Sequence, residues 1–246
     1  ICFFSVIKAN GSEVNIKNVT FEDFNFIING DLKRFGVFGY VDGNNGGVVF
    51  ENVSVHLNRP SLVTINSGEG YFLFGTLMGF AQSCKLLDCN IILSHRFDIY
   101  ISSNNLKTLS FGGMCGGMRK SSIMACSVNL IGSSIVSNIT NGTYIIGLLV
   151  GTSFSPDSNT AYLNLLNNTI ILKDASLKTN FNLNNYGYLV GGVFAPYQPV
   201  AKNNTISDFL KEDYFGNTNK LSNGNFKVDE NNNMNMLGSL DPSEIS

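Results

Sequence analysis

The chain has 246 residues, of which 43% are hydrophobic and only 14% charged, and its formal net charge is -2. This length suits one large all-β domain or two smaller ones, and the apolar fraction is sufficient for a buried core. Lys and Arg form no cluster, which argues against nucleic-acid binding, and no apolar run is long enough for a membrane-spanning helix. Because Ile1 falls inside a repeat, we expect the sequence to be a piece of a longer or processed chain.

A glycine pattern recurs along the chain at similar intervals. The clear copies are Phe111–Gly117, Gly147–Gly151 and Gly187–Gly191, and the looser copies are Ile1–Ser5, Phe35–Gly39 and Tyr71–Gly75. A second marker follows each copy and ends in Asn or Cys, at Asn18, Asn52, Cys89, Cys126, Asn168 and Asn204. Both markers advance in steps of 34 to 42 residues. Two independent markers that keep step with each other indicate a structural repeat.

Each repeat offers three short apolar segments separated by turn residues, without a sustained helical period. This pattern predicts an all-β fold, a parallel β-helix (solenoid) of about six coils with three short strands per coil over residues 1–207. The apolar rhythm fades after Ile206, so residues 208–246 are predicted to form a polar C-terminal cap, linker or tail.

Stacked coils place equivalent residues directly above one another. We therefore expect the Asn and Cys markers to form one inward-facing column, with Asn side chains hydrogen-bonded along it. In this register Lys17 lies over Glu51 as an ion pair, and Asn18 and Asn52 are buried. The sequons left as candidates for N-glycosylation are Asn138, Asn141, Asn167 and Asn203, with Asn167 and Asn203 expected to face outward.

The glycine segment, read as a single strand, is apolar on both faces. One face carries the residues Phe3, Val37, Leu73, Met114, Leu149 and Leu189. A strand that is apolar on both sides is usually buried on both sides. This strip is therefore predicted to pack against another protein chain or a neighbouring domain, or to be covered by loops of its own chain, and the sequence leaves both alternatives open.

No catalytic, cofactor or metal site is predicted from the sequence. The five Cys residues lack the paired spacing of a zinc site, and the two His residues lie in no known triad spacing. Cys89 and Cys126 are expected to stack as buried thiols, with a disulfide as the alternative. The only acidic pair predicted to stack is Glu51 over Asp88, which is short of the carboxylate cluster of a polysaccharide-processing β-helix.

Gly112-Gly113-Met114-Cys115-Gly116, followed by Ile123 and Cys126, resembles the GLUG motif, and Gly147–Gly151 and Gly187–Gly191 resemble it too. The resemblance implies a right-handed parallel β-helix in an extracellular or cell-surface protein, with a structural or adhesive role and no catalytic residues. We therefore expect a non-enzymatic scaffold, adhesin or filament subunit. Its expected partners are other protein chains or neighbouring domains, and glycans are further candidates. The alternatives are a polysaccharide-processing β-helix enzyme and a non-catalytic module of a secreted protease.

Overall fold

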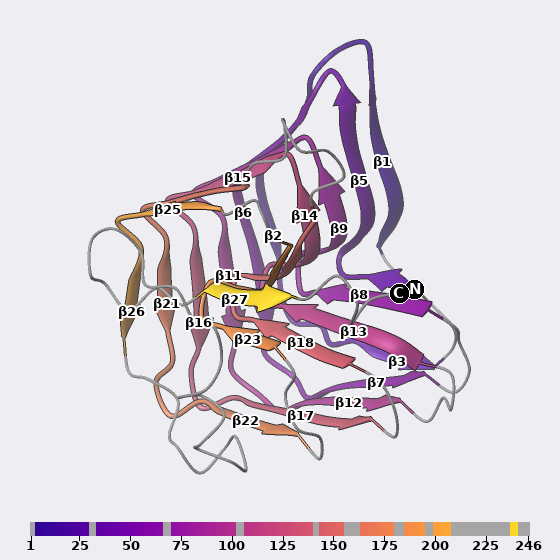
Figure 1. Ribbon diagram of the computed structural model, residues 1–246, viewed down its shortest axis with the longest axis vertical. Helices are drawn as coiled ribbons and strands as arrows, with labels where there is room; N and C mark the ends of the chain where they lie inside the picture. Colours follow the sequence, from indigo (N-terminus) through magenta and orange to yellow (C-terminus); the bar gives the residue numbers. More distant parts are fainter. Residues whose placement is uncertain are drawn as a thin grey trace.

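The computed structural model describes residues 3–29, 33–65, 70–101, 106–139, 143–154, 163–179, 185–194, 199–207 and 237–240. Within these residues the chain is all-β and winds into a solenoid whose strands are all parallel (Figure 1). The predicted fold class is confirmed. The right-handed winding implied by the GLUG resemblance stays a prediction.

Four parallel sheets form the sides of the solenoid. Sheet A consists of β1 (Phe4–Asn10), β5 (Phe38–Asn45), β9 (Met78–Gln82), β14 (Cys115–Arg119), β19 (Val150–Ser153), β24 (Val190–Phe194) and β27 (Leu237–Leu240). Sheet B consists of β2 (Val14–Phe21), β6 (Val48–Leu57), β10 (Cys84–Leu87), β11 (Asn90–Leu93), β15 (Ser121–Met124), β16 (Ser127–Leu130), β20 (Leu163–Leu166), β21 (Thr169–Ile171), β25 (Val200–Lys202) and β26 (Thr205–Ser207).

The other two sheets complete each coil. Sheet C consists of β3 (Ile27–Asn29), β7 (Ser61–Ile65), β12 (Phe97–Ile101), β17 (Ser134–Ile139) and β22 (Ser176–Thr179). Sheet D consists of β4 (Arg34–Phe35), β8 (Gly70–Gly75), β13 (Leu106–Gly112), β18 (Thr143–Gly147) and β23 (Asn185–Gly187). A coil thus runs through sheets A, B, C and D in turn, so the predicted three strands per coil were too few.

The stack makes about four turns, against the six predicted. The difference lies in the end coils, which are incomplete. In the first coil β3 has three residues and β4 only two. The last coil contributes no strand to sheet C or D among the described residues. Within the predicted cap, β27 pairs with β24 and so extends sheet A, while residues 208–236 and 241–246 lie outside the described part of the chain.

A left-handed residue forms the corner within sheet B. These residues have φ between 51° and 56° and are Asn18, Asn52, Asp88, Ala125, Asn167 and Asn203. Asn adopts this conformation more readily than most residues, which explains its recurrence. The following position faces inward and forms the column Val53, Cys89, Cys126, Asn168 and Asn204.

The predicted Asn and Cys column was therefore wrong by one residue in its first two coils. Asn18 and Asn52 belong to the exposed corner, where the Asn52 Nδ2 donates to Asn18 Oδ1 at 2.9 Å. Consequently Glu51 pairs in register with Leu87, so the predicted stack of Glu51 over Asp88 does not form. The predicted ion pair between Lys17 and Glu51 is present, at 2.5 Å.

The glycine pattern forms a sharp inward corner. Each sheet D strand ends at a bend of two residues, after which the chain starts a sheet A strand; we call this bend the D–A corner. In Figure 1, β8 and β13 of sheet D lie across the view, while β5 and β9 of sheet A rise away from them. The bends fall at residues 36–37, 76–77, 113–114, 148–149 and 188–189.

Glycine is required at this corner because two backbone segments cross closely. A Cβ on Gly112, the last residue of its sheet D strand, would lie 1.9 Å from the carbonyl oxygen of Cys115. A Cβ on Gly116, in the following sheet A strand, would lie 2.4 Å from the backbone nitrogen of Phe74. The Gly-x-x-x-Gly spacing thus places one glycine on each side of the crossing.

Candidate binding surface

The predicted apolar strip does not form a surface for a partner. Val37, Met114, Leu149 and Leu189 occupy the second bend position of the D–A corner and are completely buried in their own chain, whereas Phe3 is 60% exposed. These bend residues belong to one continuous core, so coverage by the same chain replaces the predicted partner contact at the strip.

Leu73 is the one member of the strip that was assigned to the wrong position. It pairs in register with Arg34 and Ser110 within sheet D, and Leu77 takes the corner position in its place. The correct copy of the glycine pattern in this coil is Gly75-Thr76-Leu77-Met78-Gly79, four residues later than the predicted copy.

The structure places two of the four glycosylation candidates at exposed corners. Asn167 and Asn203 are exposed with positive φ, as their predicted outward position requires. The backbone of Asn138 lies in β17, in register with Tyr100, and Asn141 lies outside the described residues. Because Asn18 and Asn52 are exposed as well, the prediction that they are buried was wrong.

Cys89 and Cys126 stack in adjacent coils as free thiols, and the backbone N–H of Cys89 donates to the Sγ of Cys126 at 3.3 Å. Burial raises the pKa of Cys126, while the hydrogen bond with Cys126 lowers the pKa of Cys89. Burial also raises the pKa of Cys84 and raises that of Cys115 to about 12. All four side chains are at most 1% exposed.

We expect these four thiols to resist alkylation by iodoacetamide in the folded protein at mildly alkaline pH. Reagent access requires local opening, and a raised pKa leaves little of the reactive thiolate at three of the four sites. Mass spectrometry of a Cys2→Ser variant, with and without denaturant, measures the result. Rapid labelling of Cys84 or Cys115 in the folded state would contradict the buried positions described above.

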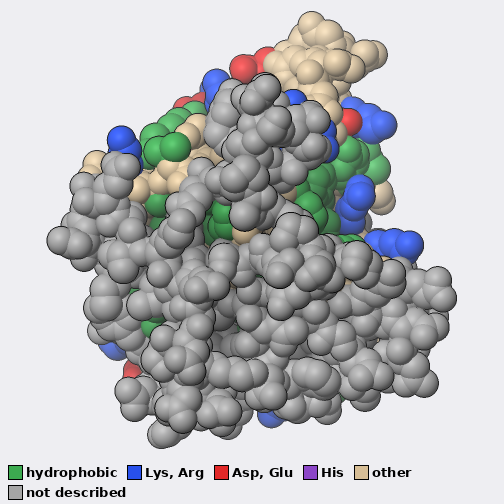
Figure 2. All heavy atoms as spheres, viewed as in Figure 1, with side chains coloured by type: hydrophobic (Ala, Val, Ile, Leu, Met, Phe, Trp, Pro, Cys, Tyr) green, Lys and Arg blue, Asp and Glu red, His purple; other side chains and the backbone are tan. Residues whose placement is uncertain are grey.

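Two outward-facing columns on sheet A bring together aromatic and charged side chains. The strand register aligns Val6, Tyr40, Phe80 and Gly117 in one column, and Lys8, Asp42, Gln82 and Arg119 in the next. The residues that alternate with them, including Val41, Ala81 and Met118, are buried in the core. Figure 2 shows hydrophobic side chains bordered by Lys and Arg side chains in the upper right part of the molecule, where β5 and β9 lie.

The D–A corner adds a cation to this face, because it turns the outer face of sheet D toward that of sheet A. The exposed Arg34 of β4 places its Cζ 4.9 Å from the ring centroid of Tyr40 and 5.3 Å from that of Phe80. The two rings stack at 5.8 Å with an interplanar angle of 15°. We call Arg34, Tyr40, Asp42, Phe80 and Gln82 the A-face cluster.

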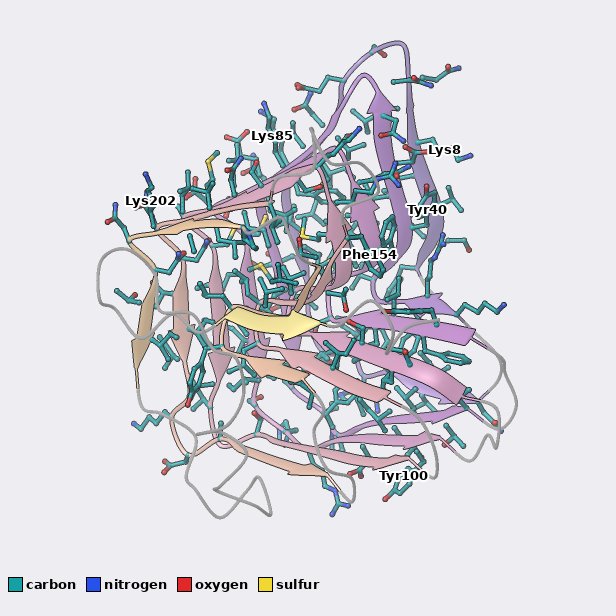
Figure 3. All side chains as sticks on the ribbon, viewed as in Figure 1. Lys8, Tyr40, Lys85, Tyr100, Phe154 and Lys202 are labelled. Atoms are coloured by element: carbon teal, nitrogen blue, oxygen red, sulfur yellow. The ribbon has the colours of Figure 1, made fainter. Side chains whose placement is uncertain are left out.

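A third ring closes the far end of the aromatic column. Phe154 follows β19 and packs its ring 5.6 Å from those of Phe80 and Tyr71. It occupies the space left by Gly117, where a Cβ would lie 2.6 Å from the Phe154 ring. Figure 3 labels Tyr40 and Phe154 beside the strands of sheet A. Deeper along the corner the two sheets touch directly, since the hydroxyls of Ser110 and Thr152 lie 2.7 Å apart.

Hydrogen bonds fix the polar members of the cluster. The Gln82 amide Nε2 donates to both the Tyr40 hydroxyl and the Asp42 carboxylate, each at 2.8 Å. Burial opposes the ionisation of Asp42, but hydrogen bonds from the Asn44 N–H and Gln82, with the charge of Lys8, keep its pKa below the usual value. Burial and the Asp42 charge raise the pKa of Tyr40, against the charges of Arg34 and Arg119.

Most carboxylates with a described partner face a basic side chain, as in the pairs Lys17–Glu51, Arg59–Asp23, Arg96–Asp98 and His56–Glu22. Among the described residues, no group of three or more His, Cys, Asp and Glu side chains could hold a metal ion. Within the same part of the chain, no helix could cross a membrane.

The A-face cluster could not be predicted from the sequence, because its members come from three coils and meet only across the D–A corner. One signal was available. Tyr40 and Phe80 each directly follow the last glycine of a corner, at Gly39 and Gly79.

In comparisons with known proteins, no family model, no curated protein and no solved structure matches this chain.

Proposed function

We propose that the protein is a non-enzymatic, adhesive segment of an extracellular or cell-surface assembly, in which the solenoid is a rigid support and the A-face cluster a binding surface. The observation that carries this proposal is the exposed Arg34 held over the Tyr40 and Phe80 rings on the outer face of sheet A. Aromatic and Arg side chains are the groups that dominate the energy of binding surfaces. The likeness to GLUG-motif proteins supports the same role.

The solenoid gives this surface a rigid base. The strands beneath the cluster contribute Val41, Ala81 and Met118, which are completely buried, and the Gln82 amide links Tyr40 to Asp42. A surface that is already ordered loses little conformational entropy on binding. The two exposed sequons Asn167 and Asn203 lie on sheet B, so glycans there would leave sheet A uncovered.

The proposal is tested by assaying the purified 246-residue chain both for binding to polysaccharides and cells and for cleavage of polysaccharides. We expect saturable binding to polysaccharide-coated or cell-coated surfaces, with no release of new reducing ends from neutral or acidic polysaccharides. Binding should weaken in an Arg34→Gln variant. Sustained release of reducing ends would instead support the polysaccharide-processing alternative and overturn the proposal.

A further inference from the structure

We propose that Asn45 is a site of spontaneous covalent modification, at which the side-chain amide is lost as ammonia and Asp or isoaspartate forms. This inference goes beyond the proposed function, because the reaction needs water but no enzyme, ligand or partner. It follows from the turn at the end of β5, which is held by hydrogen bonds on both sides of the two reacting groups but not at those groups themselves.

The reaction requires an Asn whose side chain can be reached by the backbone nitrogen of the next residue. The Gly46 nitrogen forms a bond to the Asn45 Cγ and gives up its proton to solvent, while the side-chain nitrogen takes up a proton and leaves as ammonia. Water then opens the resulting succinimide ring at either carbonyl, which gives Asp or isoaspartate. Glycine favours the first step because it has no side chain and the widest range of backbone conformations.

The turn at the end of β5 is fixed by local hydrogen bonds. The Gly47 N–H donates to the Gly43 carbonyl at 2.7 Å and closes the turn. Within it, the Asn44 N–H donates to the Asp42 carboxylate at 3.1 Å. Figure 1 shows the ends of β1 and β5 projecting together at the top of the view, so this turn lies at an extremity of the molecule.

The two reacting groups take no part in these hydrogen bonds. Asn45 and Gly46 are both exposed, and among the described residues no hydrogen bond joins the Asn45 side chain or the Gly46 N–H to another group. Gly46 has a φ of +143°, and a Cβ there would lie 2.3 Å from the Ser12 carbonyl oxygen. The turn therefore requires, directly after Asn45, the residue type that makes the reaction easiest.

A second Asn-Gly pair, Asn10-Gly11, lies beside the first and differs from it in one respect. Asn10 is exposed too and pairs in register with Asn45. The Gly11 N–H, however, donates to the Asn45 carbonyl at 2.7 Å. This nitrogen must lose its hydrogen bond before it can attack the Asn10 side chain. The structure therefore ranks Asn45 above Asn10 as the site of modification.

The modification would change the charge of the turn. Conversion of Asn45 places a second carboxylate in the turn that carries Asp42, a member of the A-face cluster. Isoaspartate also lengthens the backbone by one carbon atom. Molecules of different age would thus differ in charge at the edge of sheet A.

The test incubates the full chain at mildly alkaline pH and follows the peptides that contain Asn10 and Asn45 by mass spectrometry, which separates the amide from its two products. In the folded protein we expect Asn45 to be converted at least about threefold faster than Asn10, because only the Gly11 N–H has a hydrogen bond to lose. In denaturant both pairs lose their structure, and the two rates should become similar. An Asn45→Gln variant is the control, because its longer side chain does not form the five-membered ring.

Thermal denaturation of the Asn45→Gln variant checks that its fold is intact, and conversion of Asn10 in it should proceed as in the wild type. Equal or faster conversion of Asn10 in the folded wild type overturns the inference. So does an Asn45 that stays intact while the denatured chain is converted. A preference for Asn45 that is just as large in denaturant would assign it to the local sequence, and would likewise overturn the structural argument.

Discussion

Replacing Gly147 by Ala is expected to destabilise the protein by more than about 3 kcal/mol, because the added methyl group has no space at the D–A corner. An ideal Cβ at this position lies 1.8 Å from the carbonyl oxygen of Val150 and 2.5 Å from the backbone nitrogen of Gly191. Both neighbours are backbone atoms in strands that are paired on the two sides, so neither can rotate away. The corner would have to open.

Denaturant unfolding of the two proteins measures this difference, provided that one cooperative transition is seen. Gly132→Asn is the control, because Gly132 is exposed, has nothing within 4 Å of its Cβ and has a φ of +62°, which Asn tolerates. This variant should stay within about 0.5 kcal/mol of the wild type. A Gly147→Ala protein of nearly wild-type stability would show that the two backbones are further apart than described.

The sequence predicted the solenoid because two kinds of residue recur from coil to coil. Glycine is required at the D–A corner and Asn is favoured at the left-handed corner of sheet B, so both mark the repeat regardless of the residues between them. The sharp bend of the chain between the two glycines of the D–A corner was not predictable from these residues. Gly112 and Gly116 were interpreted as parts of one strand, whereas the strand ends at the first and a new one begins at the other side of the bend.

Register was the least predictable feature, since neighbouring residues of the same type satisfy the same pattern. In Asn167-Asn168 and Asn203-Asn204 the first Asn forms the exposed corner and the second is buried, while Asn18 and Asn52 carry only the corner role. A shift of one residue exchanges the inward and outward faces of a strand. The candidate site depends on this register and on the corner, which explains why Arg34, Tyr40 and Phe80 were not singled out.

Stacked Asn side chains were predicted to hydrogen-bond along the solenoid, and the buried pair Asn168 and Asn204 confirms it. The Asn168 Oδ1 accepts the backbone N–H of Cys126 at 3.0 Å, and its Nδ2 donates to the Ile123 carbonyl at 3.0 Å and to the Asn204 Oδ1 at 2.9 Å. Asn168 is completely buried, so water cannot replace these bonds without opening the coil.

We therefore expect Asn168→Ala to lower the free energy of unfolding by roughly 2–4 kcal/mol, because it leaves the Cys126 N–H without its acceptor and creates a small cavity. Denaturant unfolding gives the value. Asn129→Ala is the matched control, since Asn129 lies on the outer side of sheet B and donates to Asn90 at 2.8 Å where water can take its place. Its effect should stay below about 1 kcal/mol. If both variants cost the same, the ladder contributes no more than a surface hydrogen bond.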